Sequence, residues 1–308
     1  YDACMTSFTN ITSLVHNSTY YTILYAFNGG HRLLNVSVIS DGVLVDMTNP
    51  SCGWIKDGLD KDIDRNYTSK TASVLVNWGG FEDQESGIDD YSLAVYRRRP
   101  SSKANEETTV SLIHQPESVG GNTSFINWHH FHHHHGDHIY VEMNTTNGAN
   151  STITTVSTGV TVDLTAPDVQ YLGDGDVPGI NAQFSSSLSE LAANWLFIDP
   201  ESGINHHQFT VYEQHGGTKR QIFPTSDEPL ELASDVTVYT AKRLNLKAGA
   251  LYNIRVSAVN NAGLTTVHNT DGVKVDPTPP RMQYVRIGVS AGEMEDIIDG
   301  MVVSADNT

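Results

Sequence analysis

The chain has 308 residues, of which 38% are hydrophobic and 18% are charged, and its formal net charge is −18 at pH 7. This acidic balance argues against nucleic acid or an anionic membrane surface as a partner, because both attract concentrated Lys and Arg. No apolar run reaches the roughly 18 residues of a membrane-spanning helix, so the sequence predicts no membrane contact in this segment.

The first predicted elements are two strands, 20–30 and 41–46, and the second leads into the phrase VDMTNP at 45–50. Apolar and polar residues alternate along 20–30, which is typical of a half-buried strand. The phrase returns as VDLTAP at 162–167 and as VDPTPP at 275–280, at spacings of 117 and 113 residues. Since one small domain has about that length, the sequence predicts tandem repeats.

Two longer stretches also occur twice. Residues 76–96 match 193–212, and in each a Trp strand is followed by the turn Asp-X-Glu-Ser-Gly-Ile and a second strand. Residues 139–149 match 252–262 and alternate with period two. Short alternating strands around a buried Trp are typical of two facing sheets, so we expect a β-sandwich in each repeat. The expected inward residues are Trp78, Tyr91, Leu93, Val95, Ile139, Val141, Met143, Trp195, Phe209, Val211, Tyr252, Ile254, Val256 and Ala258.

A family resemblance rests on the residues before the penultimate strand. LKAGALY at 246–252 resembles the tyrosine corner of fibronectin type III domains, and LVHNSTY at 14–20 keeps its Leu and Tyr. The Asp-X-Glu-Ser-Gly-Ile turn and the VDxTxP ending resemble those of tandem fibronectin type III/immunoglobulin-like repeats in large extracellular glycoproteins. The middle copy has His133 and Ile139 in place of Leu246 and Tyr252, so its corner hydrogen bond is expected to be absent or replaced.

The resemblance implies an all-β chain of tandem fibronectin type III/immunoglobulin-like β-sandwiches, two complete and two partial. Residues 1–50 are expected to be the C-terminal part of one repeat, 51–167 and 168–280 two complete repeats, and 281–308 the start of another. The chain is therefore expected to be a window of a longer array. The alternative is that the partial ends complete each other between subunits, but together they are shorter than one repeat.

Two acidic clusters are candidates for Ca²⁺ at the junctions between repeats. In a sandwich of this kind, the turn after the Trp strand lies at the pole where the last strand of the preceding repeat arrives, and Ca²⁺ prefers carboxylate oxygens. The alternative needs no metal, because Asp also caps backbone N–H groups in turns and linkers. The acidic stretch 57–64 is expected at the opposite pole. The candidate ligands are Asp46, Asp83 and Glu85 at one junction and Asp163, Asp199 and Glu201 at the next.

The stretch WHHFHHHHGDH at 128–138 holds seven of the fourteen histidines. On an extended segment, His residues at i and i+2 point the same way, so pairs of imidazoles could bind a transition metal, with Asp137 orienting one ring. The alternative is a polar loop whose imidazoles are solvated or become charged at low pH. The candidate ligands are His129, His130, His132, His133, His134, His135 and His138.

Seven Asn-X-Ser/Thr sequons all lie before residue 153, and Cys4 and Cys52 are the two cysteines. Chance could produce sequons in a chain rich in Asn, Ser and Thr, but such sites on surface loops also accept N-linked glycans in secreted proteins. We expect glycans and a secreted or cell-surface location. Cys4 and Cys52 are candidates for one disulfide, whose geometry the sequence does not define. The sequons are Asn10, Asn17, Asn35, Asn66, Asn122, Asn144 and Asn150.

The sequence carries no hydrolase, nucleotide-binding or metalloprotease signature, so it predicts neither an enzyme nor a required cofactor beyond Ca²⁺ as a candidate. The favoured function is a structural or adhesive extracellular glycoprotein segment that acts as a rigid tandem spacer in a fibre, matrix or surface appendage. Its partners would be neighbouring repeats or other copies of the same protein. The alternatives are a receptor-like binding ectodomain and a metal-binding module built on the His-rich stretch.

Overall fold

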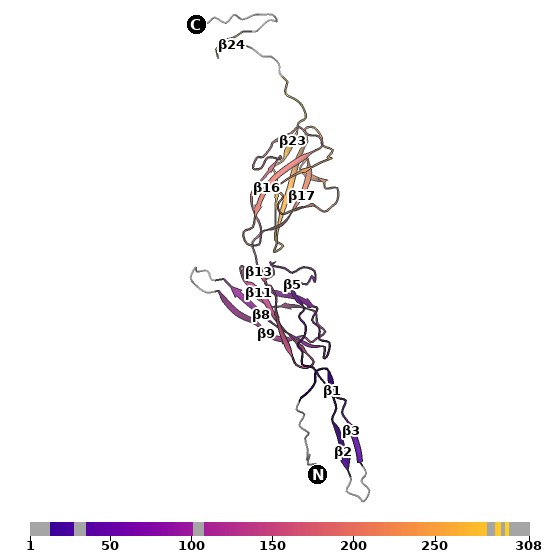
Figure 1. Cartoon of the computed structure of the whole chain (residues 1–308). Coiled ribbons are helices and arrows are strands. Elements are labelled where there is room, and N and C mark those ends of the chain that lie inside the picture. The colour runs from indigo at the N-terminus through magenta and orange to yellow at the C-terminus, as the bar shows by residue number, and fades with distance from the viewer. Residues whose placement is uncertain (1–12, 28–34, 101–107, 282–286, 291–292, 296–308) are drawn as a thin grey trace, which may run out of the picture.

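The computed structural model describes residues 13–27, 35–100, 108–281, 287–290 and 293–295. All of its elements are β-strands, which confirms the predicted all-β fold. Among the described residues, no helix is long and apolar enough to cross a membrane. The strands form two β-sandwiches that follow one another along the chain, with a smaller hairpin unit before the first (Figure 1).

The first sandwich has a three-stranded sheet in the order β10-β7-β5, facing a sheet in the order β6-β13-β11-β8-β9 with β12 paired to β11. Its central pair, β8 and β11, is antiparallel, whereas the short β6 pairs with β13 in parallel. The bounds are β5 Trp54–Asp57, β6 Tyr67–Thr68, β7 Ser73–Gly79, β8 Ile88–Arg99, β9 Thr109–Ser118, β10 Phe125–His129, β11 His138–Asn147, β12 Thr152–Val156 and β13 Val160–Val162.

The second sandwich repeats this arrangement with one additional strand, β19, in its large sheet. Its small sheet has the order β14-β16-β20, and its large sheet has the order β15-β23-β21-β17-β18 with β19 paired to β17 and β22 to β21. This pair of facing sheets confirms the predicted tandem β-sandwiches. The bounds are β14 Asp168–Asp174, β15 Phe184–Ser185, β16 Leu191–Ile198, β17 Ile204–His215, β18 Thr218–Phe223, β19 Leu230–Ala233, β20 Val238–Ala241, β21 Leu251–Asn260, β22 Thr265–Asn269 and β23 Val273–Val275.

Each sandwich encloses its own hydrophobic core, and every residue predicted to point inward in the two complete repeats is buried, whereas Leu24 and Ala26, predicted to point inward in the N-terminal copy, are exposed. The ring of Trp78 packs edge-on against Tyr91 in the first core, with 5.5 Å between ring centroids. Trp195 lies 6.1 Å from Phe209 in the second. Because large apolar side chains stabilise a fold by roughly 2 kcal/mol each when they are buried, these two cores hold the sandwiches together.

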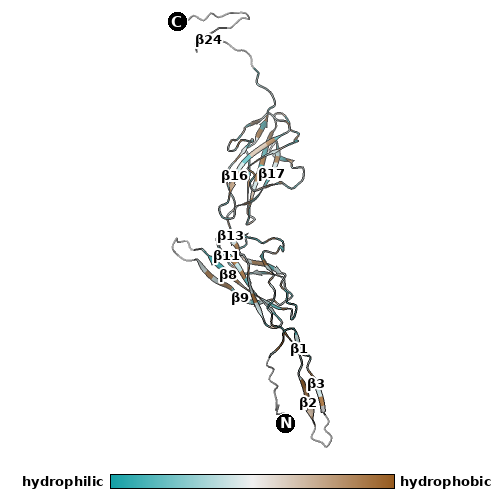
Figure 2. Ribbon diagram, viewed as in Figure 1, coloured by the Kyte–Doolittle hydropathy of each residue, from teal (hydrophilic) through white to brown (hydrophobic). Residues whose placement is uncertain are grey.

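The N-terminal unit consists of β1 Ser18–Tyr20, β2 Ile23–Phe27, β3 Asn35–Ile39 and β4 Val43–Val45, in which β1 pairs with β4 and β2 with β3. The single half-buried strand predicted over 20–30 is wrong: the backbone leaves the strand between β1 and β2, and Leu24 is 61% exposed. The reason is that no second sheet faces this hairpin within the described residues. Its apolar side chains are therefore open to solvent, as the brown β2 and β3 show in Figure 2.

Two tyrosine corners are present, as the resemblance implied. The backbone N–H of Lys247 donates to the hydroxyl of Tyr252 at 2.9 Å, and that of Val15 donates to the hydroxyl of Tyr20 at 3.0 Å. This bond fixes the loop before the penultimate strand, because it satisfies a backbone donor that the strand ladder does not reach. At the C-terminal end, β24 Ile287–Ser290 and β25 Glu293–Glu295 pair antiparallel.

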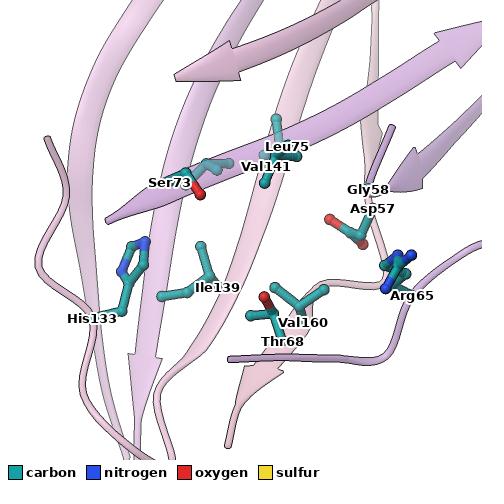
Figure 3. A pocket seen from close by; sticks show the side chains of 11 residues that line it. Asp57, Gly58, Arg65, Thr68, Ser73, Leu75, His133, Ile139, Val141 and Val160 are labelled. Carbon is teal, nitrogen blue, oxygen red and sulfur yellow. The ribbon is translucent and has the colours of Figure 1, made fainter. Parts of the chain in front are cut away.

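The middle copy has no such corner, and a small cavity lies beside the substituted positions. Ile139 is buried where the other copies have Tyr, and His133 is 4% exposed where the second sandwich has Leu246. Neither ring nitrogen of His133 has a hydrogen-bond partner, and burial lowers the pKa of this imidazole. The cavity measures about 40 Å³ and is lined at one end by His133 and at the other by Asp57 (Figure 3).

Candidate functional site

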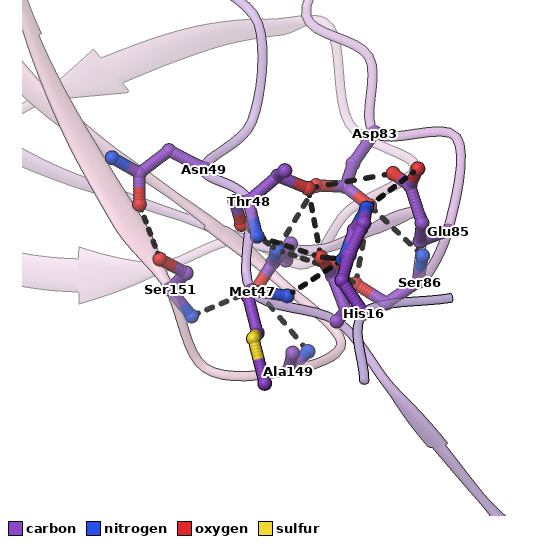
Figure 4. Close-up of polar contacts among 11 residues, drawn as sticks. His16, Met47, Thr48, Asn49, Asp83, Glu85, Ser86, Ala149 and Ser151 are labelled. Atoms are coloured by element: carbon purple, nitrogen blue, oxygen red, sulfur yellow. Dashed lines mark hydrogen bonds and ion pairs between the residues drawn. The ribbon is translucent and has the colours of Figure 1, made fainter. Parts of the chain in front are cut away.

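The most organised polar site lies where the N-terminal unit meets the first sandwich (Figure 4). Asp46 is central to it, because both of its carboxylate oxygens accept hydrogen bonds there. One carboxylate oxygen of Asp46, Oδ2, accepts hydrogen bonds from the Ser86 hydroxyl at 2.6 Å and from the Asn147 amide at 2.9 Å. The other, Oδ1, accepts from the Thr48 backbone N–H at 2.9 Å and the Thr48 hydroxyl at 2.8 Å. The end of one unit is thus bonded to two loops of the next.

The same arrangement recurs between the two sandwiches, centred on Asp163. Oδ2 accepts from the Ser202 hydroxyl at 2.6 Å and from the Asn260 amide at 3.0 Å. Oδ1 accepts from the Thr165 backbone N–H at 2.9 Å and the Thr165 hydroxyl at 2.7 Å. We call each set of one Asp, one Ser, one Asn and one Thr a junction latch.

The orientation of the amide in each latch is fixed by backbone donors. Asn147 Oδ1 accepts the backbone N–H of Ser151 at 2.7 Å, and Asn260 Oδ1 accepts that of Leu264 at 2.8 Å. Since the amide oxygen is used there, the amino group must face the carboxylates. It donates a second bond to Asp83 in the first latch and to Asp199 in the second, each at 2.9 Å.

A histidine from the preceding unit completes each junction. Nδ1 of His16 accepts the backbone N–H of Met47 at 3.2 Å, and Nδ1 of His135 accepts that of Leu164 at 3.1 Å. Because a backbone N–H can only donate, Nδ1 carries no proton in either ring. The ring of His16 also lies 3.4 Å, through Nε2, from the Glu85 carboxylate.

Hydrogen bonding keeps the latch carboxylates ionised. The Ser86 hydroxyl, followed by the Thr48 donors, lowers the pKa of Asp46 to about 2. Burial opposes ionisation of Asp163, but the bonds from Ser202 and Thr165 outweigh it, so the pKa of Asp163 lies below its ordinary value. The negative charges therefore persist at neutral pH and strengthen every bond they accept.

The calcium candidates gather at the first junction but only partly at the second. One oxygen each of Asp46, Asp83 and Glu85 lie within 4.8 Å of one another, the single group of this kind among the residues with described positions. At the second junction Asp163 and Asp199 converge on Asn260, whereas Glu201 is exposed and outside such a group. In both junctions an amide N–H donor bridges the two aspartates, so hydrogen bonds already satisfy them. Calcium binding stays a prediction.

The His-rich stretch is not gathered into one cluster. His129 ends β10 and His138 begins β11. In the loop between them the rings of His132 and His134 lie next to each other, with 5.4 Å between centroids, whereas the ring of His133 stacks on Phe131. His133 enters the core, and His135 joins the second latch. Within the described part of the chain, the stretch supplies no group of three ligand atoms within 4.8 Å. Transition-metal binding by His129, His130, His132 or the others stays a prediction.

Asp137 pairs with Arg99, and its Oδ2 also lies 3.6 Å from Nδ1 of His134, so the orienting of a metal-binding imidazole by Asp137 stays a prediction. The guanidinium makes two bonds to its carboxylate, Nε to Oδ1 at 2.6 Å and Nη2 to Oδ2 at 2.8 Å. The backbone N–H of His134 donates a third at 2.8 Å. Arg99 Nη2 also lies 2.8 Å from Nδ1 of His134. A buried carboxylate paired in this way fixes the loop before β11.

The predicted glycosylation sites differ in exposure. Asn17, Asn66, Asn122 and Asn150 are exposed, whereas Asn144 is half-buried on β11 and its Oδ1 accepts the Thr154 hydroxyl at 2.7 Å. Asn10 and the side chain of Asn35 lie outside the described residues. Cys52 is exposed, and Cys4 also lies outside them, so the disulfide stays a prediction.

Sequence reasoning missed several residues that the structure makes central. The sequence did not identify His16, Ser86 and Ser202 as junction residues. The signal for the histidines was their alignment, because His16 lies four positions before Tyr20 and His135 lies four positions before Ile139, which matches Tyr20. Asn147 and Asn260 occupy the same position in the aligned repeats, and this repetition was the signal that could have identified them as junction residues.

Two buried carboxylates at the opposite pole were missed as well. Asp57, at the start of the acidic stretch 57–64, is 3% exposed and accepts the backbone N–H of Gly159 at 2.6 Å. Asp174, its counterpart, accepts that of Gly272 at 3.2 Å. Burial raises the pKa of each of these carboxyls to about 6.

Comparisons with known proteins give little beyond the fold. No family model matches the sequence, and no curated protein matches it. Among solved structures, the chain is similar to the crystal structure of the chicken CNTN1 FN1-FN3 domains, with a TM-score of 0.38 and 12% sequence identity, over 81% of this chain and 89% of that chain.

Proposed function

We propose that this chain is a segment of a structural, adhesive glycoprotein outside the cell, in which β-sandwich repeats are held end to end as a stiff spacer. The observation that carries the proposal is the junction latch, which occurs twice with the same four residue types and the same bonds. A flexible tether between domains would need no such contacts.

The latches favour a stiff connection between repeats because breaking their hydrogen bonds is energetically unfavourable. The side chains of Asp46 and Asp163 are each 1% exposed. Removing the donors to a buried carboxylate leaves a desolvated charge, which costs roughly 1–3 kcal/mol or more. A hinge motion between Asp163 and the second sandwich would have to break the Ser202 and Asn260 bonds together.

The linkers support the same function. Pro50 and Pro167 end the two phrases between repeats, and proline restricts the backbone to an extended φ. A direct contact adds to the linker between the sandwiches, where the Ser69 hydroxyl donates to the carbonyl of Ala262 at 3.0 Å.

The test compares the full chain with its Ser202→Ala, Asn260→Ala double variant. X-ray scattering and residual dipolar couplings should show a wider spread of angles between the sandwiches in the variant, while each core stays folded. The matched control is Asn127→Ala with Asn245→Ala, one exposed position on each sandwich outside the latches, which should leave the angle unchanged.

Unchanged angles in the latch variant would overturn the stiff-spacer proposal. The same measurement with and without a calcium chelator separates the two kinds of junction. If chelation loosens the chain and the double variant does not, a metal clamp holds the repeats instead of hydrogen bonds.

The extracellular setting is supported by the exposed sequons at Asn17, Asn66, Asn122 and Asn150. Glycopeptide mass spectrometry of the protein from its natural source should find N-linked glycans at these positions, because exposed Asn-X-Ser/Thr sites are modified in the secretory pathway. Unmodified Asn at all four would contradict this part of the proposal.

A further inference from the structure

A groove on the first sandwich lies against the second sandwich at the junction between them. It lies at the pole facing the second sandwich, has a volume of about 490 Å³, and includes Tyr67 and Ser69 in its wall. Ala262, in the turn after β21 of the second sandwich, also lines this groove. The bond from the Ser69 hydroxyl to the Ala262 carbonyl, at 3.0 Å, holds that turn in place.

The second sandwich carries a groove of the same kind at its own far pole. Its volume is about 520 Å³. Seven of its lining positions coincide with those of the first groove at an offset of 117 residues. The pairs are Gly58 and Gly175, Leu59 and Asp176, Arg65 and Ala182, Tyr67 and Phe184, Thr68 and Ser185, Ser69 and Ser186, and Leu75 and Ala192.

The two poles differ in what covers them. Tyr67 is half-buried at the pole that contacts the second sandwich, whereas Phe184, its counterpart, is 64% exposed. The apolar ring of Phe184, in the wall of the second groove, is therefore open to a partner.

The third VDxTxP phrase adds an independent observation at this pole. Asp276 Oδ1 accepts the backbone N–H of Thr278 at 3.0 Å and also its hydroxyl, which is the inner half of a junction latch. In Asp46 and Asp163, Oδ2 accepts a Ser hydroxyl and an Asn amide from the next repeat. Oδ2 of Asp276 has no such donor among the residues that the structure describes.

We propose that this pole of the second sandwich is the docking surface for a following β-sandwich repeat of the same type. In that repeat, the turn equivalent to the one after β21 packs against the groove beside Phe184. The Ser186 hydroxyl donates to a carbonyl of that turn, as the Ser69 hydroxyl donates to the carbonyl of Ala262. A Ser and an Asn of that repeat donate to Oδ2 of Asp276. This inference rests on the proposed function, because it assumes that repeats stack through latches.

The occupant is a following repeat, since the groove and the latch lie at the point where the chain leaves the sandwich. β23 leads directly into Asp276, as β13 leads into Asp163 before the second sandwich. VDPTPP has the same length as VDLTAP. A repeat that begins after Pro280 would therefore reach this groove with the linker that already places the second sandwich on the first.

The experiment inserts a second copy of residues 168–280 after Pro280 in the full chain. The inserted copy carries Val177→Ile, so that its groove peptides differ in mass from those of the original. Hydrogen exchange is then followed by mass spectrometry in peptides that span both residue 177 and residues 183–190. The original groove should exchange at least about tenfold more slowly than in the unextended chain, equivalent to ~1.4 kcal/mol, and the inserted groove should show no such slowing.

The control is the same extended chain with Ser202→Ala and Asn260→Ala in the inserted copy alone, which should lose the slowing. Peptides around Trp195 have the same sequence in both copies, so a single slowly exchanging population there shows that the inserted copy is folded. Residues 66–71 provide the reference for the existing junction.

If 66–71 are protected and 183–190 of the original copy are not, the docking surface is wrong and the spacer proposal stands. If neither is protected, both fail. If 183–190 of the unextended chain become protected as its concentration rises, the groove takes another chain in trans, which overturns the in-line arrangement.

Discussion

In the second sandwich, Tyr252 closes the corner before β21 with its hydroxyl, and Leu246 packs beneath it. In the first sandwich, Ile139 and His133 stand at those two places, and a cavity of about 40 Å³ lies beside them. The junctions that precede these cores are nevertheless bonded alike, through Asp46 and Asp163. The two repeats therefore vary in the core and agree at the pole.

Local physics explains why the variation falls where it does. A substitution in one core costs a few kcal/mol at one place, and the remaining contacts of the sandwich absorb it. A latch combines donors from three segments on one buried carboxylate, so losing either Ser202 or Asn260 leaves a charge without its partner. We therefore expect a substitution in the core to be tolerated better than the loss of a hydrogen-bond donor in a latch.

The largest expected effect comes from giving the second sandwich the corner of the first. Leu246→His with Tyr252→Ile should destabilise it by about 4 kcal/mol, because the ring contacts are lost and a buried imidazole gains no partner. Native-state hydrogen exchange of the β21 amides measures this, with the β11 amides of the first sandwich as an unchanged internal reference.

The reverse substitution sharpens the comparison. His133→Leu should stabilise the first sandwich by about 1–2 kcal/mol, since it replaces a 96%-buried imidazole without hydrogen-bond partners by an apolar side chain. A loss of stability in this variant would mean that the imidazole has a partner that makes it favourable there, and that the two corners are equivalent after all.

The second effect is shared by both sandwiches and depends on pH. Burial raises the pKa of Asp57 and Asp174 from 3.8 to about 6. Between pH 4 and 6 the folded state keeps a proton that the unfolded chain has released. Each sandwich should therefore gain stability as the pH falls from 7 toward 4, by at most about 3 kcal/mol.

Carboxyl-carbon NMR titration measures the two midpoints directly, and denaturation at pH 7 and pH 4.5 measures the gain. Asp174→Asn should abolish the gain in the second sandwich and leave it in the first. Midpoints near 4 for both carboxyls would contradict the prediction. Below pH 4 the trend reverses, because carboxylates with lowered pKa values, such as Asp163, then lose their charge.

The sandwich cores could be predicted from the sequence because alternation with period two places residues such as Val141 and Ile254 on one face without knowledge of the rest. The latches could be predicted only in part. The aspartates stood out in a repeated phrase, but Asn147 and Asn260 act through amide orientation, which backbone donors 4 residues away determine. His133 and His135 lie two residues apart in the same run of histidines, yet His133 is buried and His135 is exposed, which composition alone does not predict.

The smallest expected effect tests the tyrosine corner itself. Tyr252→Phe removes only the hydroxyl that accepts the Lys247 N–H, so the second sandwich should lose about 1 kcal/mol and the Lys247 amide should exchange faster. Tyr171→Phe, on the half-buried β14, is the matched control and should change neither quantity. If Tyr252→Phe leaves Lys247 exchange unchanged, the hydroxyl contributes nothing to the corner. The replacement of Tyr252 by Ile139 would then matter only through the smaller volume of the isoleucine side chain. The two sandwiches would differ at this corner only in the cavity and in His133.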